Sequence, residues 1–195
     1  MNSGKIAPAH ASRLSKGENE IVKLNRVWTV VVPKSTGRLV AAGLLMGLCA
    51  TFAHPDRGPS DLARDMLAAH NAVRKPLRLA PFSWSSKLAT TAQSWADDLL
   101  RRGQFFHRPH PSYGENLFEI NGGRVTPEEV VHDWTAESED YDYPSNRCRS
   151  VCGHYTQIVW RSTYEVGCAV ARGGGREVWV CEYSPPGNVV GQKPY

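Results

Sequence analysis

Apolar side chains recur at intervals of three and four along two stretches of the chain, as in helices with one buried face. The first predicted helix spans Ser60–Arg74, and the second spans Ser83–Arg102 and ends before Gly103. The stripes consist of Leu62, Met66, Ala69 and Val73 in the first helix and of Leu88, Ala92, Trp95 and Leu99 in the second. Residues 104–123 are rich in His, Pro, Gly and Asn, and we expect this segment to be irregular.

A third helix has the clearest start signal. Thr126 suits the N-cap, Pro127 the first helical position and Glu129 the third, which together form a capping box. We expect this helix to run towards Glu139, and a short helical turn to follow at 154–160.

Two β-prone segments, 166–171 and 177–183, flank three consecutive glycines. A hairpin that turns at Gly174 and Gly175 places Cys168 directly opposite Cys181, at a spacing that a disulfide can bridge. Helices around a small antiparallel sheet predict an α+β sandwich.

The N-terminal third of the chain has a different character. Residues 1–37 show weak periodicity, and we expect them to be disordered or peripheral. Residues 39–53 form an apolar run that follows Lys34 and Arg38, is short for a membrane span and ends in small residues, as in a signal peptide. We expect cleavage after Ala53 and export, with an uncleaved membrane anchor facing outside as the alternative. The predicted domains are a leader, 1–53, and a single domain, 54–195.

The basic excess of the chain lies in that leader. The net charge of the whole chain is +4, whereas residues 54–195 contain 16 Lys and Arg against 17 Asp and Glu. The domain therefore offers no general electrostatic surface for nucleic acid.

Cysteine usage agrees with export. Cys49 lies in the apolar run, which leaves four cysteines for the domain, and an even number in an exported domain favours disulfides. With Cys168 paired to Cys181, Cys148 pairs locally with Cys152. The alternative is a four-cysteine zinc site.

Three segments contain candidate polar site residues. Val130, Trp134 and Glu137 share one face of the third helix, so Glu137 either has a polar partner or turns to water at the rim. His110 and Glu115 lie in the stiff loop 105–118, which is either a binding loop or a solvated one. His154 begins a helical turn, where a neutral imidazole is favoured and a structural role is equally possible. No His-Glu-x-x-His, Gly-x-Ser-x-Gly or phosphate-binding glycine motif is present.

At these segments the chain resembles the CAP family, which includes plant pathogenesis-related-1 proteins, venom antigen-5 and cysteine-rich secretory proteins. The resemblance covers roughly residues 61–195, in family order. It rests on His70-Asn71-Ala72-Val73-Arg74, Gly114-Glu115-Asn116-Leu117, Gly153-His154-Tyr155-Thr156-Gln157, Val180-Cys181-Glu182-Tyr183 and the closing Gly191-Gln192-Lys193-Pro194-Tyr195. It implies a three-layer α-β-α sandwich.

The resemblance also implies a central cleft lined by two histidines and two glutamates, which map to His110, Glu115, Glu137 and His154. In several relatives the two histidines hold zinc or another divalent ion, so His110 and His154 are the implied ligands here. His70 is implied to be a structural residue. The chain departs from the plant pattern of six cysteines, because Phe105 stands where one of them is expected, and one of the three bridges is missing.

We expect a secreted, monomeric, non-enzymatic binding module with a metal-capable site and, by the same resemblance, a lipid, sterol or extracellular protein ligand. One alternative is a metal-dependent hydrolase that uses Glu115 or Glu137 as its base. Another is an interaction protein in which the four residues form only a structural polar network.

Overall fold

The computed structural model describes residues 12–14 and 59–195, and side chains from residue 61 onward. The expected signal peptide, its cleavage site and Cys49 lie outside the described residues. The helices are α1 (Pro59–Arg74), α2 (Ser86–Arg102), α3 (Pro127–Ala136) and α4 (Gly153–Ile158), with short 3-10 helices η1 (Lys75–Leu77) and η2 (Glu137–Asp140). The strands are β1 (Ser12–Leu14), β2 (Ser83–Trp84), β3 (Gly114–Asn121), β4 (Tyr141–Asp142), β5 (Arg147–Cys148), β6 (Glu165–Gly173) and β7 (Arg176–Ser184).

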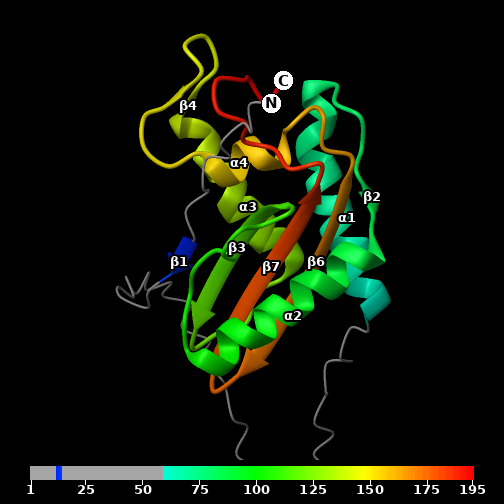
Figure 1. Ribbon diagram of the computed structural model, residues 1–195, viewed down its shortest axis with the longest axis vertical. Helices are drawn as coiled ribbons and strands as arrows, with labels where there is room; N and C mark the ends of the chain where they lie inside the picture. The colour runs from blue at the N-terminus through cyan, green and yellow to red at the C-terminus, as the bar shows by residue number, and fades with distance from the viewer. Residues whose placement is uncertain (1–11, 15–58) are drawn as a thin grey trace, which may run out of the picture. The chain divides into compact units, whose positions relative to one another are not determined.

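Five strands form a mixed sheet in the order β1-β3-β7-β6-β2 (Figure 1). The central pairs β3–β7 and β7–β6 are antiparallel, as expected, whereas the edge strands β1 and β2 pair in parallel with β3 and β6. The β6–β7 hairpin has the predicted register, since Cys168 lies opposite Cys181. Disulfides join Cys168 to Cys181 and Cys148 to Cys152, which confirms both predicted pairs.

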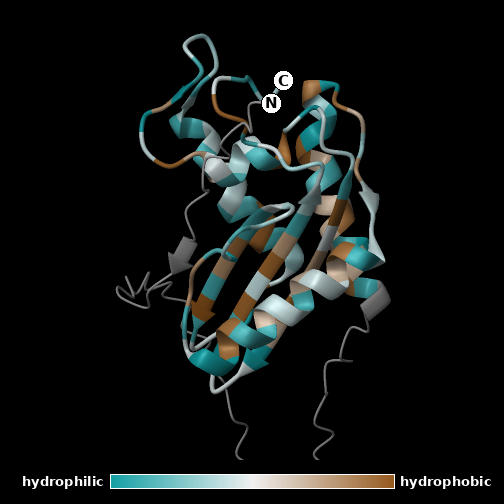
Figure 2. Ribbon diagram, viewed as in Figure 1, coloured by the Kyte–Doolittle hydropathy of each residue, from teal (hydrophilic) through white to brown (hydrophobic). Residues whose placement is uncertain are grey.

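Each face of the sheet carries its own hydrophobic core, which confirms the three-layer α+β sandwich. Helix α2 covers one face through residues such as Ala92, Trp95 and Leu99. Helices α1, α3 and α4 cover the other through residues such as Met66 and Trp134. Figure 2 shows hydrophobic residues concentrated along the central strands and polar residues on the outer sides of the helices.

The helix predictions are largely confirmed. Helix α1 matches its predicted range to one residue, and Thr126 forms the predicted capping box with Glu129. The second helix begins at Ser86, three residues later than predicted, because Ser83 and Trp84 form a strand that pairs with β6. Helix α3 changes to a 3-10 turn at Glu137. None of the described helices is both long and apolar enough to cross a bilayer.

The expectation of an irregular segment at 104–123 is wrong for its second half, which forms β3. Helices cover both faces of this strand, so residues 114–119 are buried without the alternation that marks a half-exposed strand. Glycine, glutamate and asparagine at its start further hid it from pattern reading.

A buried arginine fixes helix α4 to the rest of the domain. The Arg74 guanidinium, 0% exposed, donates hydrogen bonds to the carbonyls of Ile158 (2.7 Å) and Trp160 (3.0 Å) at the end of α4. It also stacks on the Phe82 ring, 3.8 Å from the ring centroid. Because α4 carries His154, Arg74 helps to set the position of that histidine.

Candidate functional site

The first half of the site is a histidine held by a buried glutamate. Glu115 is the second residue of β3 and is 7% exposed. Its Oε1 lies 2.7 Å from Nδ1 of His107 and accepts a 3.0 Å hydrogen bond from the backbone N–H of Arg108. A carboxylate only accepts, so Nδ1 of His107 carries a hydrogen, and in the neutral ring Nε2 keeps its lone pair.

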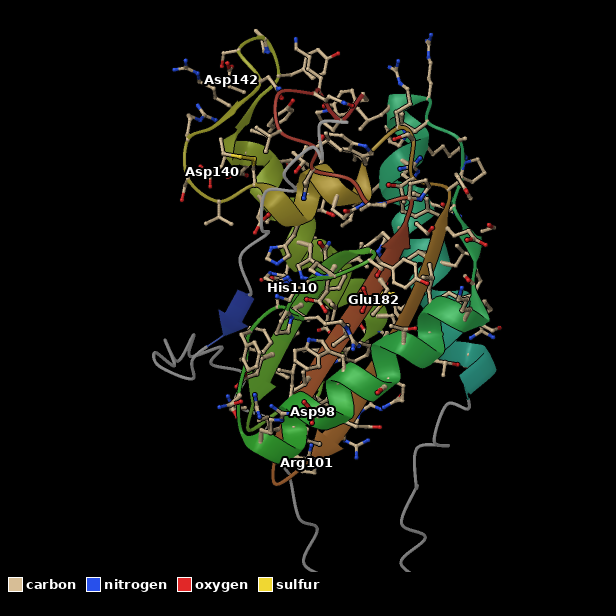
Figure 3. The ribbon with its side chains drawn as sticks, viewed as in Figure 1. Asp98, Arg101, His110, Asp140, Asp142 and Glu182 are labelled. Atoms are coloured by element: carbon tan, nitrogen blue, oxygen red, sulfur yellow. A yellow bond between two sulfur atoms is a disulfide. The ribbon has the colours of Figure 1, made fainter. Side chains whose placement is uncertain are left out.

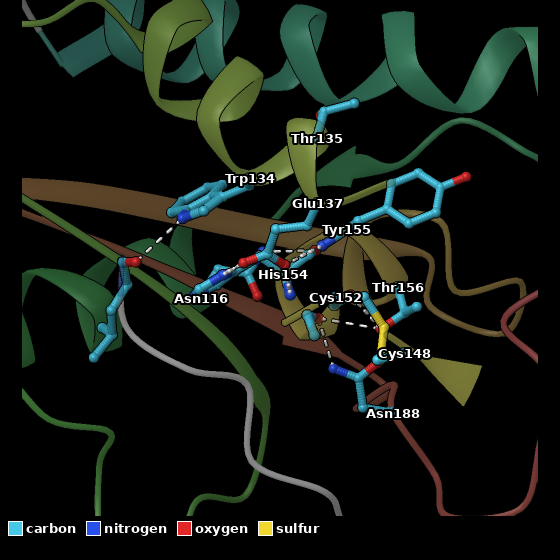
Figure 4. Close-up of polar contacts among 12 residues, drawn as sticks. Asn116, Trp134, Thr135, Glu137, Cys148, Cys152, His154, Tyr155, Thr156 and Asn188 are labelled. Atoms are coloured by element: carbon cyan, nitrogen blue, oxygen red, sulfur yellow. Dashed lines mark hydrogen bonds and ion pairs between the residues drawn. A yellow bond between two sulfur atoms is a disulfide. The ribbon is translucent and has the colours of Figure 1, made fainter. Parts of the chain in front are cut away.

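The second half repeats this arrangement with a different histidine. Glu137 begins η2, and its Oε1 lies 2.6 Å from Nδ1 of His154. Its Oε2 accepts hydrogen bonds from the backbone N–H groups of His154 (2.9 Å) and Tyr155 (3.4 Å). The Trp134 ring stacks on the His154 ring at 6.0 Å between centroids (Figure 4). In the neutral ring, Nε2 of His154 therefore also has a free lone pair.

Two glycines allow helices to lie close to the sheet, one on each face. A Cβ on Gly114, the first residue of β3, would lie 2.1 Å from Oε1 of Gln157 on α4, so any larger residue would displace the Gln157 amide. The start of β3 and the helix of His154 are thereby in direct contact. On the other face, a Cβ on Gly167 would lie 2.3 Å from the backbone nitrogen of Ala89, which brings α2 close to the sheet.

The structure brings together Glu115, Glu137 and His154 in glutamate–histidine pairs, but it does not place His110 with them. His107 occupies the position expected for His110. His110 is exposed, has a left-handed φ of 52° between Pro109 and Pro111, and is labelled on its loop in Figure 3. We refer to His107, Glu115, Glu137 and His154 as the His–Glu site.

The difference from the predicted residue has a physical reason. Assigning the histidine by counting back from Glu115 assumes a fixed loop length, and loops change length readily. The usable signal was Phe105, which packs against the α2 core and so fixes the near end of the loop two residues before His107.

Seven buried side-chain atoms lack a hydrogen-bond partner within residues 61–195, and all seven belong to this region. They are Trp95 Nε1, His107 Nε2, Arg108 Nε, Glu115 Oε2, Asn116 Oδ1, His154 Nε2 and Glu182 Oε1. Contacts link these residues into one group. Glu182 lies opposite Glu115 in the β3–β7 register, Arg108 Nε lies 3.6 Å from Glu182 Oε1, and the Arg108 guanidinium carbon lies 4.9 Å from the centroid of the Trp95 ring.

Glu182 is the most perturbed acid of the group. It is 1% exposed, and burial, followed by the nearby Glu115 carboxylate, raises its pKa to about 8 despite Arg108. At neutral pH it is mainly protonated. Sequence reasoning missed Glu182, Arg108 and Asn116 as parts of the site, although a glutamate directly after the apolar run 178–181 was a visible signal at Glu182.

A second group of ligand-type atoms does not form a metal site. His70, Cys168 and Cys181 have ligand atoms within 4.8 Å of one another, the one such group of three or more His, Cys, Asp or Glu in the described part of the chain. Its two sulfurs are joined in a disulfide, and both ring nitrogens of His70 are engaged, with the Met66 carbonyl and the Tyr183 hydroxyl. His70 is structural, in agreement with the resemblance.

Comparisons with known proteins agree with this architecture. The family model described as "CAP: Cysteine-rich secretory protein family" matches residues 67–183. Pathogenesis-related protein 1B of Nicotiana tabacum is 42% identical over 135 residues, covering 68% of this chain and 80% of the relative. Pathogenesis-related protein 1 of Arabidopsis thaliana is 40% identical over 136 residues, covering 69% and 83%.

Two solved structures share the fold. Venom allergen-like protein 4 of Schistosoma mansoni has a TM-score of 0.58 at 27% identity, covering 68% of this chain and 92% of that one. A structure titled as NaASP2 with Zn2+ has a TM-score of 0.60 at 25% identity, covering 72% and 88%.

Proposed function

The chain belongs to the CAP family of cysteine-rich secretory proteins, and on that premise we propose that it is an exported binding protein whose His–Glu site holds a divalent cation between His107 and His154. Glu115 and Glu137 orient the two rings through their Nδ1–H groups. Zinc is the first candidate, because neutral imidazole nitrogen is one of its preferred ligands. A bound cation would supply a positive charge to which a ligand of the protein can attach.

One observation carries this proposal: the region has an excess of buried acceptors. Four of the seven unpartnered atoms hold lone pairs and no hydrogen, namely His107 Nε2, His154 Nε2, Glu115 Oε2 and Asn116 Oδ1. Buried acceptors cost free energy when they lack a partner, and native proteins retain few of them. A cation satisfies acceptors, and carboxylate-oriented histidines are the usual surroundings of a metal ligand set.

Binding fits the site better than hydrolysis does. Catalytic zinc normally has three protein ligands, and among the described residues neither His107 nor His154 belongs to a group of three His, Cys, Asp or Glu whose ligand atoms lie within 4.8 Å of one another. The hydrolase alternative needs Glu115 or Glu137 as a free base. Each of them already accepts hydrogen bonds from a histidine ring and from backbone N–H groups, so neither is free to act as that base.

Zinc titration by calorimetry tests the proposal. His107→Ala and His154→Ala should each reduce zinc affinity by more than about a hundredfold, because each removes a ligand, while circular dichroism shows an intact fold. His110→Ala is the matched control, since it removes an exposed histidine three residues away, and its affinity should equal that of the wild type. Affinity should also fall in acid, because protonated imidazole cannot bind a metal.

Zinc affinity that is unchanged in the His107→Ala/His154→Ala double variant would eliminate the cation site. The four residues would then form a structural polar network. A loss with His110→Ala equal to that with His107→Ala would instead return His110 to the ligand set and contradict the assignment of His107.

Export is part of the same proposal, with residues 54–195 as the mature, monomeric domain. It is supported by the two disulfides, which form in oxidising compartments, and by family membership. Sequencing the N-terminus of protein recovered outside the cell should give a start near His54. Intact protein held in the membrane fraction would favour the anchor alternative.

A second candidate function, binding of a lipid or sterol, is favoured by a groove between α1 and α3. The groove has a volume of about 630 Å³, in the range of small-molecule sites, and its lining combines apolar residues such as Ala69, Val73 and Val131 with charged ones such as Arg64 and Glu128. Mass spectrometry of the exported protein should detect a co-purified lipid. Ala68→Trp, on the exposed side of the groove, should remove that lipid, and its retention would place the ligand elsewhere.

A further inference from the structure

The two disulfides of the domain differ in their exposure. Cys168 and Cys181, on the paired strands β6 and β7, are 2% and 0% exposed. Cys168 borders a groove between α1 and α2, but the residue itself stays buried. Cys148, at the end of β5, is exposed, whereas its partner Cys152 is 2% exposed. Cys148 is thus the one exposed cysteine in the described part of the chain.

A pocket beside the Cys148–Cys152 disulfide gives access to it. The pocket has a volume of about 320 Å³, which lies in the range of small-molecule sites. Its lining includes both cysteines of this bridge and, from the C-terminal segment, Val189, Val190 and Gln192. Figure 4 shows the disulfide close to Thr156 and Asn188, which also line the pocket.

The two sulfurs of this bridge are not equally open to attack. Cys152 is the N-cap of α4, and its carbonyl accepts hydrogen bonds from the backbone N–H and from the hydroxyl of Thr156, both at 3.0 Å. Asn188 donates a 2.8 Å hydrogen bond to the carbonyl of the next residue, Gly153. Thiol–disulfide exchange depends on which sulfur a thiolate can reach. Since Cys152 is buried and fixed, the reachable sulfur is that of Cys148.

The segment that carries Cys148 has further attachments to the domain. The Tyr143 hydroxyl donates a 2.6 Å hydrogen bond to the Tyr195 carbonyl, and the two rings stack with 4.8 Å between their centroids. The Asn146 amide donates a 3.0 Å hydrogen bond to the Gln192 carbonyl. These contacts can hold the segment in place when the disulfide opens.

We propose that the Cys148–Cys152 disulfide is a thiol-exchange site, at which a small thiol enters the pocket and forms a mixed disulfide with Cys148. The thiolate attacks the Cys148 sulfur, and a new S–S bond forms as the bond to Cys152 breaks. The electron pair of the broken bond leaves on the Cys152 sulfur, which then takes up a proton. This exchange does not require a bound cation.

A second thiol completes the reaction. It attacks the mixed disulfide at the sulfur of the first thiol, and Cys148 leaves as a thiolate and is protonated. Two small thiols are thereby oxidised to one disulfide, and the protein disulfide is reduced to two cysteine thiols.

Reduced glutathione, added to the oxidised exported protein without denaturant, tests the site. Iodoacetamide then blocks free thiols, and mass spectrometry of peptides locates both groups. Glutathione should appear on Cys148 and the alkyl group on Cys152. This bridge should open about a hundredfold faster than the Cys168–Cys181 bridge, which is the internal control, while circular dichroism shows an intact fold.

A matched pair of variants tests entry through the pocket. Val190→Trp adds bulk to a pocket residue that is 64% exposed and should slow the exchange several-fold. Tyr164→Trp is the control, because Tyr164 is 58% exposed and is not part of the pocket lining, and its rate should equal that of the wild type.

Three results would contradict the proposal. Equal rates at the two bridges, or glutathione on Cys152, would overturn exchange at Cys148. An unchanged rate in Val190→Trp would overturn entry through the pocket. Loss of the folded circular dichroism spectrum when only this bridge is open would make the bridge a structural constraint rather than an exchange site.

Discussion

The two ends of the β3–β7 pair differ in whether the oxygens of their buried glutamates have hydrogen-bond partners. At the hairpin end, Glu119 and Glu177 are each about 2% exposed and pair with Arg176 (2.9 Å) and Arg172 (2.7 Å). Asn121 also donates to Glu119, and the Trp179 ring N–H donates to Glu177. All four carboxylate oxygens are engaged.

At the other end, Glu115 and Glu182 are buried to a similar degree, and each keeps one oxygen without a partner. One arginine, Arg108, serves both, through its backbone N–H to Glu115 and a long 3.6 Å approach to Glu182. The same two strands thus show that this protein can satisfy buried carboxylates. Free acceptors at one end therefore indicate a function rather than poor packing.

We call the hairpin end of the β3–β7 pair, with Glu119 and Glu177, the closed end, and the other end, with Glu115 and Glu182, the open end. Removing an arginine from the closed end should have the largest effect on stability. Arg176→Ala removes the ionic partner of Glu119 and the hydrogen bonds to the Leu99 and Gln104 carbonyls. The free energy of unfolding should fall by about 4 kcal/mol, because a buried carboxylate loses an ionic partner. Urea denaturation measures this.

The control for that variant is Arg101→Ala, which removes an arginine paired with Asp98 on the surface at the end of α2. Its effect should stay within about 0.5 kcal/mol. Equal effects of the two variants would contradict the importance of burial at the closed end. Zinc affinity should be unchanged in both.

Removing the Cys168–Cys181 disulfide, which lies beside the open end, should have the second-largest effect on stability. Cys168 and Cys181 are 13 residues apart, and Cys181 precedes Glu182. The Cys168→Ala/Cys181→Ala variant should lose about 3 kcal/mol of unfolding free energy, since a closed loop restricts the unfolded chain. The Cys148→Ala/Cys152→Ala variant, with a separation of 4, should lose about 2 kcal/mol. A reversed order of the two losses would show that native contacts, rather than loop length, decide the contribution of each bridge.

The smallest expected effect is the pH dependence of the unfolding free energy that Glu182, at the open end, contributes. Between pH 4.5 and 8 the unfolded chain ionises Glu182 while the folded protein keeps its proton, so the folded state binds more protons and loses stability as pH rises. Between pH 5.5 and 7.5 this contributes a loss of about 2 kcal/mol in the wild type. Glu182→Gln cannot ionise and should lack that part of the slope.

Glu177→Gln is the matched control, since it changes a buried glutamate of the closed end on the same strand. It should be less stable than the wild type at every pH and keep the wild-type pH slope. Unfolding free energies at pH 5.5, 6.5 and 7.5 make the comparison. A wild-type slope in Glu182→Gln would mean that Glu182 is ionised in the folded protein.

Features set by neighbours in the sequence were predictable. The capping box at Thr126, the C-terminal glycine of α2, the hairpin at Gly174–Gly175 and both disulfides depend on residues close along the chain. Helical periodicity also placed Val130 and Trp134 on a buried face with Glu137 just beyond them. Short-range hydrogen bonds and backbone preferences act on any chain with these residues, and so they can be read without the fold.

Only the tertiary structure decided the rest. The strand β3 exists because β7 pairs with it and helices cover both of its faces. The selection of His107 over His110 depends on the path of a loop, and Asn116 meets Tyr183 and His154 across 67 and 38 residues of chain. These contacts join separate elements, and their free energy depends on burial and on exact partners that no local pattern encodes. The sequence determined which residue types were present for the proposed cation site, and packing determined which of their atoms have no hydrogen-bond partner.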